Sequence, residues 1–196
     1  MQKLEIPHKP FYFLRHGETS WNAEHRIMGQ TNIPLNSVGI QQAESVAKLL
    51  KTHAHFESIA TSPLKRALQT AEIIAQACNK PIKIIDGLQE ATWGILEGSI
   101  IHDFLAFDRW KNGHPMEGGE KYDEFLKRIT LGFHNALSLT SEPVLIVSHG
   151  GVYWEIQSLL KLPQRKFSNC TPLFHQPTQN PNNIWSVTKI YLRKKE

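Results

Sequence analysis

Residues 11–17 of the chain read Phe-Tyr-Phe-Leu-Arg-His-Gly, an apolar run that ends in two basic side chains and a glycine. A short apolar run bounded by polar residues is typical of a strand buried on both faces. Residues 143–151, Pro-Val-Leu-Ile-Val-Ser-His-Gly-Gly, repeat this design. The two runs predict buried strands, each followed at its carboxyl end by a histidine, His16 or His149.

Between these runs, apolar residues recur at strand and at helical spacing. Further strands are expected over 58–61 and 82–85, and helices over 43–50, 64–71, 122–133 and 152–160. Strands that alternate with amphipathic helices indicate an α/β fold, here a three-layer α/β/α sandwich with a largely parallel central sheet. In such sheets ligands collect at the carboxyl ends of the strands, where both histidines are expected.

Three segments fall outside this pattern. Ser62 and Pro63 are expected to cap and open the helix that follows them. Residues 93–120 are rich in glycine, tryptophan and histidine, and we expect an irregular insert over the active site. Residues 169–183 are rich in proline, asparagine and glutamine, which predicts a loop before a final strand over 184–192.

Composition excludes several classes of protein. A chain of 196 residues with 40% hydrophobic residues can bury its own core, and a single domain over 1–196 is expected. The net charge of +4 is dispersed, and the basic end at 193–196 is read as a solvated terminus, so no nucleic-acid partner is expected. No segment approaches the roughly 18 apolar residues that span a bilayer, so the protein is expected to be cytoplasmic, with no membrane partner.

No metal or disulfide is expected either. Cys78 and Cys170 lie far apart without the spacing of a zinc site. His53 and His55 are close in sequence, but no cysteine or carboxylate group joins them. The oligomeric state does not follow from the sequence.

The histidine at the end of the first strand is suited to covalent phosphoryl transfer. A neutral imidazole can attack phosphorus through one ring nitrogen while the other nitrogen donates a hydrogen bond that fixes the tautomer. Gly17 would allow close approach of the backbone. Arg15 is adjacent, and Arg66 falls in the first turn of a predicted helix. Guanidinium groups are suited to the charged oxygens of the transition state.

A leaving alkoxide also needs a proton. Glu90 and Glu97 both follow the predicted strand over 82–85, and the residues alone do not choose between them. Whichever serves has to be protonated when the substrate is bound.

Five blocks of sequence, in the expected order, resemble the histidine phosphatase superfamily, also called the phosphoglycerate mutase-like family. They cover residues 14–22, 26–39, 62–71, 88–98 and 148–151. The resemblance implies metal-independent chemistry without a cofactor, in which His16 is phosphorylated and Glu90 is the general acid. It implies that Arg15, Arg66 and His149 grip the phosphate. The substrate-binding positions are Asn22, Met28, Gly29 and Gly150.

The substrate is less well defined than the chemistry. The family often has glutamine or a small polar residue where this chain has Met28, and commonly aspartate where it has Asn32. The segment from Glu90 to His149 is shorter than in the mutase branch, which favours hydrolysis of a small phosphorylated metabolite. A phosphoglycerate mutase, and a non-catalytic phosphoryl-ligand binding module, are the alternatives. The aromatic residues Trp93, Phe104, Phe107 and Trp110 are expected to line the pocket rather than only to anchor the insert.

Overall fold

The computed structural model describes residues 4–100, 105–180 and 184–191. In chain order the elements are β1 (Phe11–Arg15), α1 (Ser20–Ala23), α2 (Ser37–His53), β2 (Ser58–Thr61), α3 (Lys65–Cys78), β3 (Ile82–Ile84), the 3-10 helices η1 (Asp86–Leu88) and η2 (Gly94–Leu96), α4 (Leu105–Lys111), α5 (Tyr122–Leu137), β4 (Val144–Ser148), α6 (Gly150–Leu159), β5 (Leu173–Pro177) and β6 (Trp185–Lys189).

The strands form one six-stranded sheet in the order β3-β2-β4-β1-β5-β6. The first four strands are parallel to one another, and β5 and β6 add an antiparallel edge next to β1. The prediction of an α/β fold with a largely parallel central sheet is therefore confirmed.

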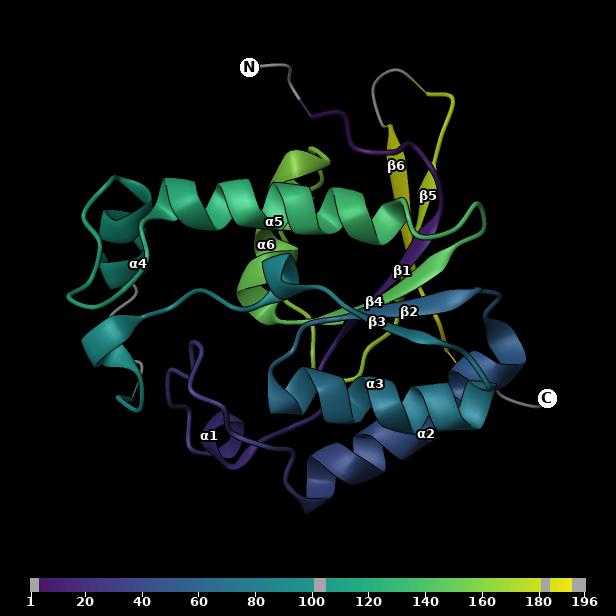
Figure 1. Cartoon of the computed structure of the whole chain (residues 1–196), viewed down its shortest axis with the longest axis horizontal. Coiled ribbons are helices and arrows are strands. Elements are labelled where there is room, and N and C mark those ends of the chain that lie inside the picture. Colours follow the sequence, from purple (N-terminus) through teal and green to yellow (C-terminus); the bar gives the residue numbers. More distant parts are fainter. Residues whose placement is uncertain (1–3, 101–104, 181–183, 192–196) are drawn as a thin grey trace.

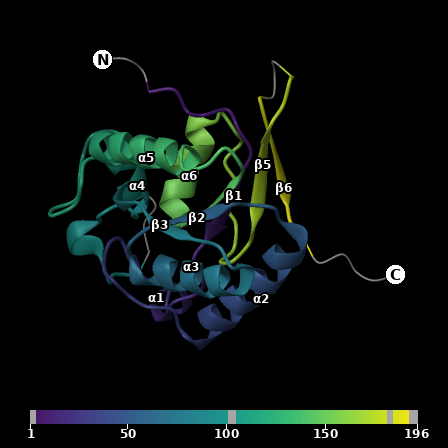
Figure 2. The same ribbon diagram turned by 45° about the vertical axis from the view of Figure 1, so that its right-hand side comes forward.

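Helices cover both faces of this sheet. Helices α2 and α3 lie on one face and α5 and α6 on the other (Figures 1 and 2). Successive residues of a strand point to opposite faces. Accordingly, Leu14 and Val147 belong to the apolar cluster on the α2–α3 side, and Phe13 and Ile146 to the cluster on the α5–α6 side. This burial on both faces explains why the two runs contain no polar residue until they end.

The pairing of β1 with β4 places the two histidine segments side by side. Arg15 pairs with Ser148 in the parallel register, and the amide of His16 donates to the carbonyl of Ser148 over 3.0 Å. Both chains leave the sheet at this point. The sequence predicts both strands, and the structure shows that they are neighbours in the sheet.

The insert over 93–120 is more ordered than predicted, because it contains η2 and α4. The Trp93 and Trp110 rings are 4.5 Å apart between centroids, and the Trp110 indole donates to the carbonyl of Glu120 over 2.7 Å. These contacts fasten α4 at the end of the sheet where α1 also lies (Figure 1). His102 and Phe104 lie outside the described residues, as do Leu192 and the basic end at 193–196.

The predicted start of α3 is wrong. The helix begins at Lys65 with Leu64 as its N-cap residue, and not at Ser62 and Pro63. The Ser62 hydroxyl lies 2.8 Å from the His149 ring and so serves the site instead. The amide of Lys65 donates to the side-chain oxygen of Asn32 over 2.7 Å, so a distant loop supplies the cap.

The predicted loop over 169–183 is also wrong in part, because it contains strand β5. Leu173 and His175 are buried on one side of this strand, against β1. The proline and polar residues that follow conceal this short alternation in the sequence. In the part of the chain that the structure describes, no helix has the length and apolar content to cross a membrane.

Helix α5 offers a test of this packing. Ile129 is fully buried, whereas Leu131 on the same helix is 52% exposed. Ile129→Ala should lower the free energy of unfolding by about 2–5 kcal/mol, because it leaves a cavity in the core. Leu131→Ala, the matched control, should change it by less than about 1 kcal/mol. Urea denaturation followed by circular dichroism measures both values. Equal losses would contradict the orientation of α5.

Candidate active site

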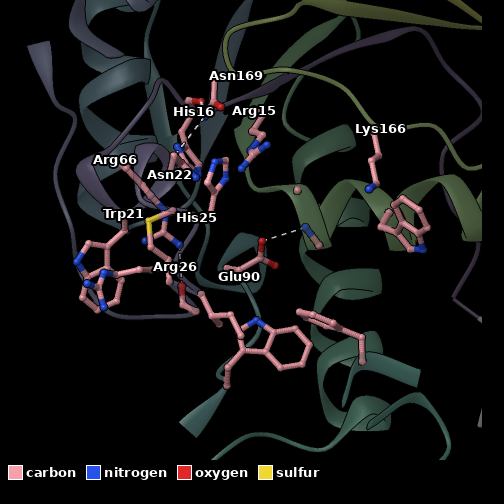
Figure 3. A pocket seen from close by; sticks show the side chains of 18 of the residues that line it. Arg15, His16, Trp21, Asn22, His25, Arg26, Arg66, Glu90, Lys166 and Asn169 are labelled. Atoms are coloured by element: carbon pink, nitrogen blue, oxygen red, sulfur yellow. Dashed lines mark hydrogen bonds between the residues drawn. The ribbon is translucent and has the colours of Figure 1, made fainter. Parts of the chain in front are cut away.

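A cavity of about 650 Å³ opens at the carboxyl ends of β1 and β4. Among the residues that line it are all the predicted site residues except His149, namely Arg15, His16, Asn22, Met28, Gly29, Arg66, Glu90 and Gly150. The labelled side chains of His16, Arg15, Arg66, Asn22 and Glu90 converge on it from different segments of the chain (Figure 3).

His16 is held in one orientation and in its neutral form. Its Nδ1 atom lies 2.7 Å from the carbonyl oxygen of Gly17, which can only accept, so Nδ1 carries the proton and Nε2 carries the lone pair. Burial, and then the charges of Arg66 and Arg15, hold its pKa well below the usual value. The ring therefore presents an unprotonated Nε2 at neutral pH.

Gly17 is required by the path of the chain. A Cβ atom at this position would lie 2.5 Å from the carbonyl oxygen of Gly39, at the start of α2. The backbone around His16 is further fixed by Asn169, whose side-chain amide donates to the His16 carbonyl over 2.7 Å. Close packing on both sides leaves the imidazole little freedom to move.

Two guanidinium groups provide positive charge beside this ring. The Nε atom of Arg15 is buried and has no hydrogen-bond partner among the described residues, and burial lowers the pKa of this side chain. A buried donor without a partner is costly, which favours an anionic ligand at this position. Arg66 is 1% exposed, and burial lowers its pKa to about 10, so it remains charged at neutral pH.

Arg66 also organises the loop opposite α3. Its two terminal nitrogens donate to the carbonyls of Gly29 over 2.7 Å and Thr31 over 3.0 Å. A Cβ atom on Gly29, which has a φ of 52°, would lie 2.0 Å from a Glu97 oxygen. A side chain at residue 29 would therefore displace Glu97, which holds the same loop through the amides of Gln30 and Thr31.

His149 lies behind His16, with 5.2 Å between the ring centroids. Arg66 Nε donates to its Nδ1 over 3.3 Å, so its proton lies on Nε2 and is donated to the Ser62 hydroxyl. Burial and the Arg66 charge keep its pKa well below the usual value. The second imidazole is thus neutral as well, and both of its nitrogens are engaged.

The geometry distinguishes the two candidate acids. Glu90 lines the cavity, with Oε2 accepting from the amide of Gly151 over 2.9 Å (Figure 3). A Cβ atom on Gly151 would lie 2.3 Å from this carboxyl group, which explains the second glycine after His149. Glu97 instead accepts the amides of Gln30, Thr31 and Trp93 and the Thr31 hydroxyl. Its carboxylate is committed to holding the loop, so only Glu90 faces the cavity.

The remaining predicted positions lie around the same opening. The side-chain oxygen of Asn22 accepts from the amide of Thr19 at 3.2 Å, which orients its amide nitrogen away from α1. The sulfur of Met28 accepts from the Thr19 hydroxyl at 3.2 Å. Gly150 lies beside Arg15, whose Nε would be 3.8 Å from a Cβ atom at this position.

The far part of the cavity is largely aromatic. Trp93, Phe107 and Trp110 line it, as the sequence predicts, and Phe125 of α5 and Trp154 of α6 add two further rings. Among the described residues Trp154 makes no contact with another ring. Lys166 points into the cavity on the side opposite Trp21 and His25 (Figure 3).

Several lining residues were not predicted. They include Glu155, which is 2% exposed and is bonded to the Lys111 ammonium at 2.9 Å and to the Tyr122 hydroxyl at 2.8 Å. Asn169 is another, and it lies in the segment predicted to be a featureless loop. Glu155 interrupts the apolar face of α6, and a buried carboxylate in an apolar pattern is the one signal that could have indicated it. No cluster of three or more metal-ligating side chains occurs in the described ranges.

The sheet, the cavity at its edge and the paired histidines define an α/β protein in which imidazole and guanidinium groups meet at the carboxyl edge of the sheet. Residues 11–176 match the family model of the histidine phosphatase superfamily, branch 1. The chain belongs to this superfamily, as its five sequence blocks predict.

The chain is similar to a named relative and to solved structures. One relative is a protein of Proteus mirabilis named probable phosphoglycerate mutase GpmB. The two sequences are 38% identical over 149 residues, which cover 71% of this chain and 68% of the relative. The structure of this chain resembles Bacillus stearothermophilus YhfR, with a TM-score of 0.77 and 27% identity over 92% of this chain and 95% of that one. It shares its fold with a mycobacterial glucosyl-3-phosphoglycerate phosphatase solved with VO₃, with a TM-score of 0.75 and 23% identity over 92% and 98% of the two chains.

The buried imidazoles predict how stability depends on pH. Burial lowers the pKa of His175 to about 3, and the pKa values of His16 and His149 are also depressed. In the unfolded chain each ring takes up a proton near pH 6.5, whereas the native protein does not, so the unfolded chain binds more protons below this pH. The free energy of unfolding should fall as pH drops from about 7 to 5, by up to about 1.4 kcal/mol per pH unit for each ring.

Urea denaturation at pH 7.5, 6.5 and 5.5 measures this slope. His16→Asn should reduce the slope by the contribution of one ring, up to about 1.4 kcal/mol per pH unit, because it removes one of the three buried imidazoles. His114→Asn, which changes an exposed histidine, should leave the slope as it is in the unmodified protein. An unchanged slope in His16→Asn would show that His16 titrates normally in the folded protein.

Proposed function

We propose that this protein hydrolyses phosphomonoesters through a phosphohistidine formed on His16. The observation that carries the proposal is the unprotonated Nε2 of a neutral imidazole, directed into a cavity beside two buried guanidinium groups. One of these, Arg15, holds a buried Nε donor that has no partner among the described residues. A phosphate group would satisfy that donor and the charge together.

In the first step Nε2 of His16 attacks phosphorus, and the bond from phosphorus to the ester oxygen breaks. Glu90, protonated when the substrate is bound, transfers its proton to the leaving oxygen, so an alcohol departs and not an alkoxide. Nδ1 keeps its proton and its bond to the Gly17 carbonyl, which supports the positive charge that develops on the ring.

In the second step water attacks the phosphohistidine. The Glu90 carboxylate accepts a proton from this water, the bond between Nε2 and phosphorus breaks, and inorganic phosphate leaves. Glu90 regains its proton and His16 its lone pair, so the cycle closes without a metal ion or cofactor.

Fixed positive charge stabilises the phosphoryl group as it passes from the ester oxygen to Nε2 of His16, and then from Nε2 to the oxygen of water. Arg15 and Arg66 supply guanidinium donors, and Asn22 supplies an amide donor. His149 can turn toward the phosphate by exchanging the bond from its protonated Nε2 to the Ser62 hydroxyl for one to a phosphoryl oxygen. Because these groups are already positioned and largely desolvated, little reorganisation is needed during the reaction.

The substrate is proposed to be a small phosphorylated metabolite whose alcohol part contacts the aromatic end of the cavity. An apolar wall is formed by Trp154, Phe107 and Trp93, with Lys166 at its rim.

Phosphoglycerate mutase activity is the second candidate function, because the Proteus relative is named as a probable mutase. Release of inorganic phosphate from a panel of phosphorylated metabolites, compared with interconversion of 2- and 3-phosphoglycerate, separates the two. Interconversion without phosphate release would favour the mutase.

His16→Ala tests the covalent step. Turnover of an aryl phosphate should fall by at least about 10⁴-fold, because no other group in the cavity replaces the nucleophile. Circular dichroism should show an intact fold. The unmodified protein, quenched during turnover, should carry acid-labile phosphate that is missing from the variant. Substantial residual activity in His16→Ala would exclude a phosphohistidine at this position.

Glu90→Gln tests the proton donor, with Glu97→Gln as its counterpart in the adjacent loop. Glu90→Gln should lower kcat/KM, which reports the first step alone, by roughly 10²–10⁴-fold for alkyl phosphates and much less for p-nitrophenyl phosphate, because nitrophenolate needs no proton to leave. In Glu97→Gln both substrates should change by a similar factor. The rate optimum of the unmodified protein should lie on the acidic side of neutrality. The reverse pattern would assign the acid to Glu97.

A further inference from the structure

The loop that carries Glu90 has no strand partner for its carbonyl groups. After β3 the chain forms the single turn η1 and then continues through Gln89 and Glu90 to the cavity. Four consecutive carbonyl oxygens, those of Gly87, Leu88, Gln89 and Glu90, accept hydrogen bonds from side chains. Ser148 supplies the bond to Leu88, and Arg128 of α5 supplies the other three.

Arg128 uses all five of its N–H donors here. Nη1 donates to the carbonyls of Gln89 at 2.7 Å and Gly87 at 3.3 Å, and Nη2 donates to the carbonyl of Glu90 at 2.7 Å. The remaining two donors bind the Glu120 carboxylate, with Nη2 2.6 Å from Oε1 and Nε 3.0 Å from Oε2. A guanidinium group has five donors in a fixed plane, so this arrangement leaves none for a substrate.

Glu120 connects the same guanidinium to the far side of the Glu90 loop. Its Oε1 accepts from the amide of Thr92 at 2.9 Å, and its own amide donates to the Thr92 carbonyl at 3.1 Å. The ion pair is mostly buried, with side-chain exposures of 25% for Arg128 and 15% for Glu120. Residues 87–92 are thus fixed from both sides of Glu90 by one pair of charges.

Helix α5 can hold the loop this closely because two glycines face each other. A Cβ atom on Gly87 would lie 2.8 Å from Cα of Gly132, and a Cβ atom on Gly132 would lie 2.7 Å from the carbonyl carbon of Gly87. The Arg128 guanidinium also lies over the Phe125 ring, 4.8 Å from its centroid. Its position is set by packing as well as by hydrogen bonds.

We propose that Arg128, paired with Glu120, is a positioning residue that sets where the Glu90 carboxyl group lies relative to His16. The inference rests on the proposed role of Glu90 as the general acid. The Glu90 side chain is held by the amides of Gly151 and Ala91, but its backbone is held by Arg128 and by Gln30, whose amide donates to the same carbonyl at 3.0 Å.

The physical consequence is a selective loss of acid catalysis when the clamp is removed. Proton transfer requires the carboxyl group within hydrogen-bond reach of the leaving oxygen, and a shift of about 1 Å can cost roughly 100-fold in rate. Attack by His16 does not depend on this loop, because His16 is held by β1, Gly17 and Asn169. In the first step, which kcat/KM reports, only substrates that need a proton on the leaving group should be slowed strongly.

The test compares p-nitrophenyl phosphate with the best alkyl phosphate substrate of the protein. Arg128→Met keeps much of the alkyl chain over Phe125 and removes the donors. Its kcat/KM should fall roughly 30–100-fold for the alkyl phosphate and less than about 5-fold for the nitrophenyl ester. Arg128→Lys keeps the charge but not the planar fork, so its loss with the alkyl phosphate should be smaller than that of Arg128→Met. Lys127→Met, which removes a charge from the exposed neighbouring position, should change neither rate.

Two further variants keep the inference open to refutation if Arg128→Met does not fold. Glu120→Gln should show the same selective loss at smaller size, as should Arg128→Lys. In a Glu90→Gln background, Arg128→Lys should add less than about 3-fold to the loss for the alkyl phosphate, because the group that it positions has gone. Equal loss with both substrates, or an undiminished effect in the Glu90→Gln background, would overturn the positioning role.

Failure of the inference is distinguishable from failure of the proposed function. If Glu90→Gln itself shows no dependence on the leaving group, the assignment of the acid is wrong. If Glu90→Gln shows that dependence and the folded Arg128 and Glu120 variants do not, the acid is correctly assigned and only the clamp is refuted.

Discussion

The parallel pairing of β1 with β4 is the interaction on which the site depends. It aligns Arg15 with Ser148, so that both strands end at the same level and release His16 and His149 side by side. The hydrogen bond from the His16 amide to the Ser148 carbonyl continues the ladder for one more residue. A slip of one residue in this register would turn each of these side chains to the opposite face of the sheet.

Packing then supplies the chemical state of the imidazoles. Both rings are almost completely buried beside Arg66 and Arg15, so a proton on either ring would be penalised twice, by lost hydration and by like charge. The hydrogen bond to the Gly17 carbonyl then decides which nitrogen of His16 keeps its hydrogen. Burial, charge and one carbonyl oxygen together make His16 a neutral ring with a free Nε2.

The carboxylates show how the same residue type takes different roles in one loop. Glu97 accepts four hydrogen bonds, three of them from backbone amides, and is structural, because its oxygens have no free direction toward the cavity. Glu90 accepts two amide bonds and still borders the cavity. The loop that leads to Glu90 is stabilised by side chains from α5 and β4, which bind its carbonyl groups.

The sequence by itself determined the α/β class, the parallel character of the sheet and the family, because the apolar periodicity and the five blocks are local properties of the chain. It also indicated the residues that line the cavity at the ends of β1 and β4. Only the tertiary structure placed Glu90, and not Glu97, in the lining of the cavity, assigned the α3 cap to Asn32, revealed β5 and brought Arg128, Glu155 and Asn169 near the site. Each of these depends on contacts between segments distant in the sequence, and a hydrogen bond across such a distance leaves no periodic pattern in the residues that form it.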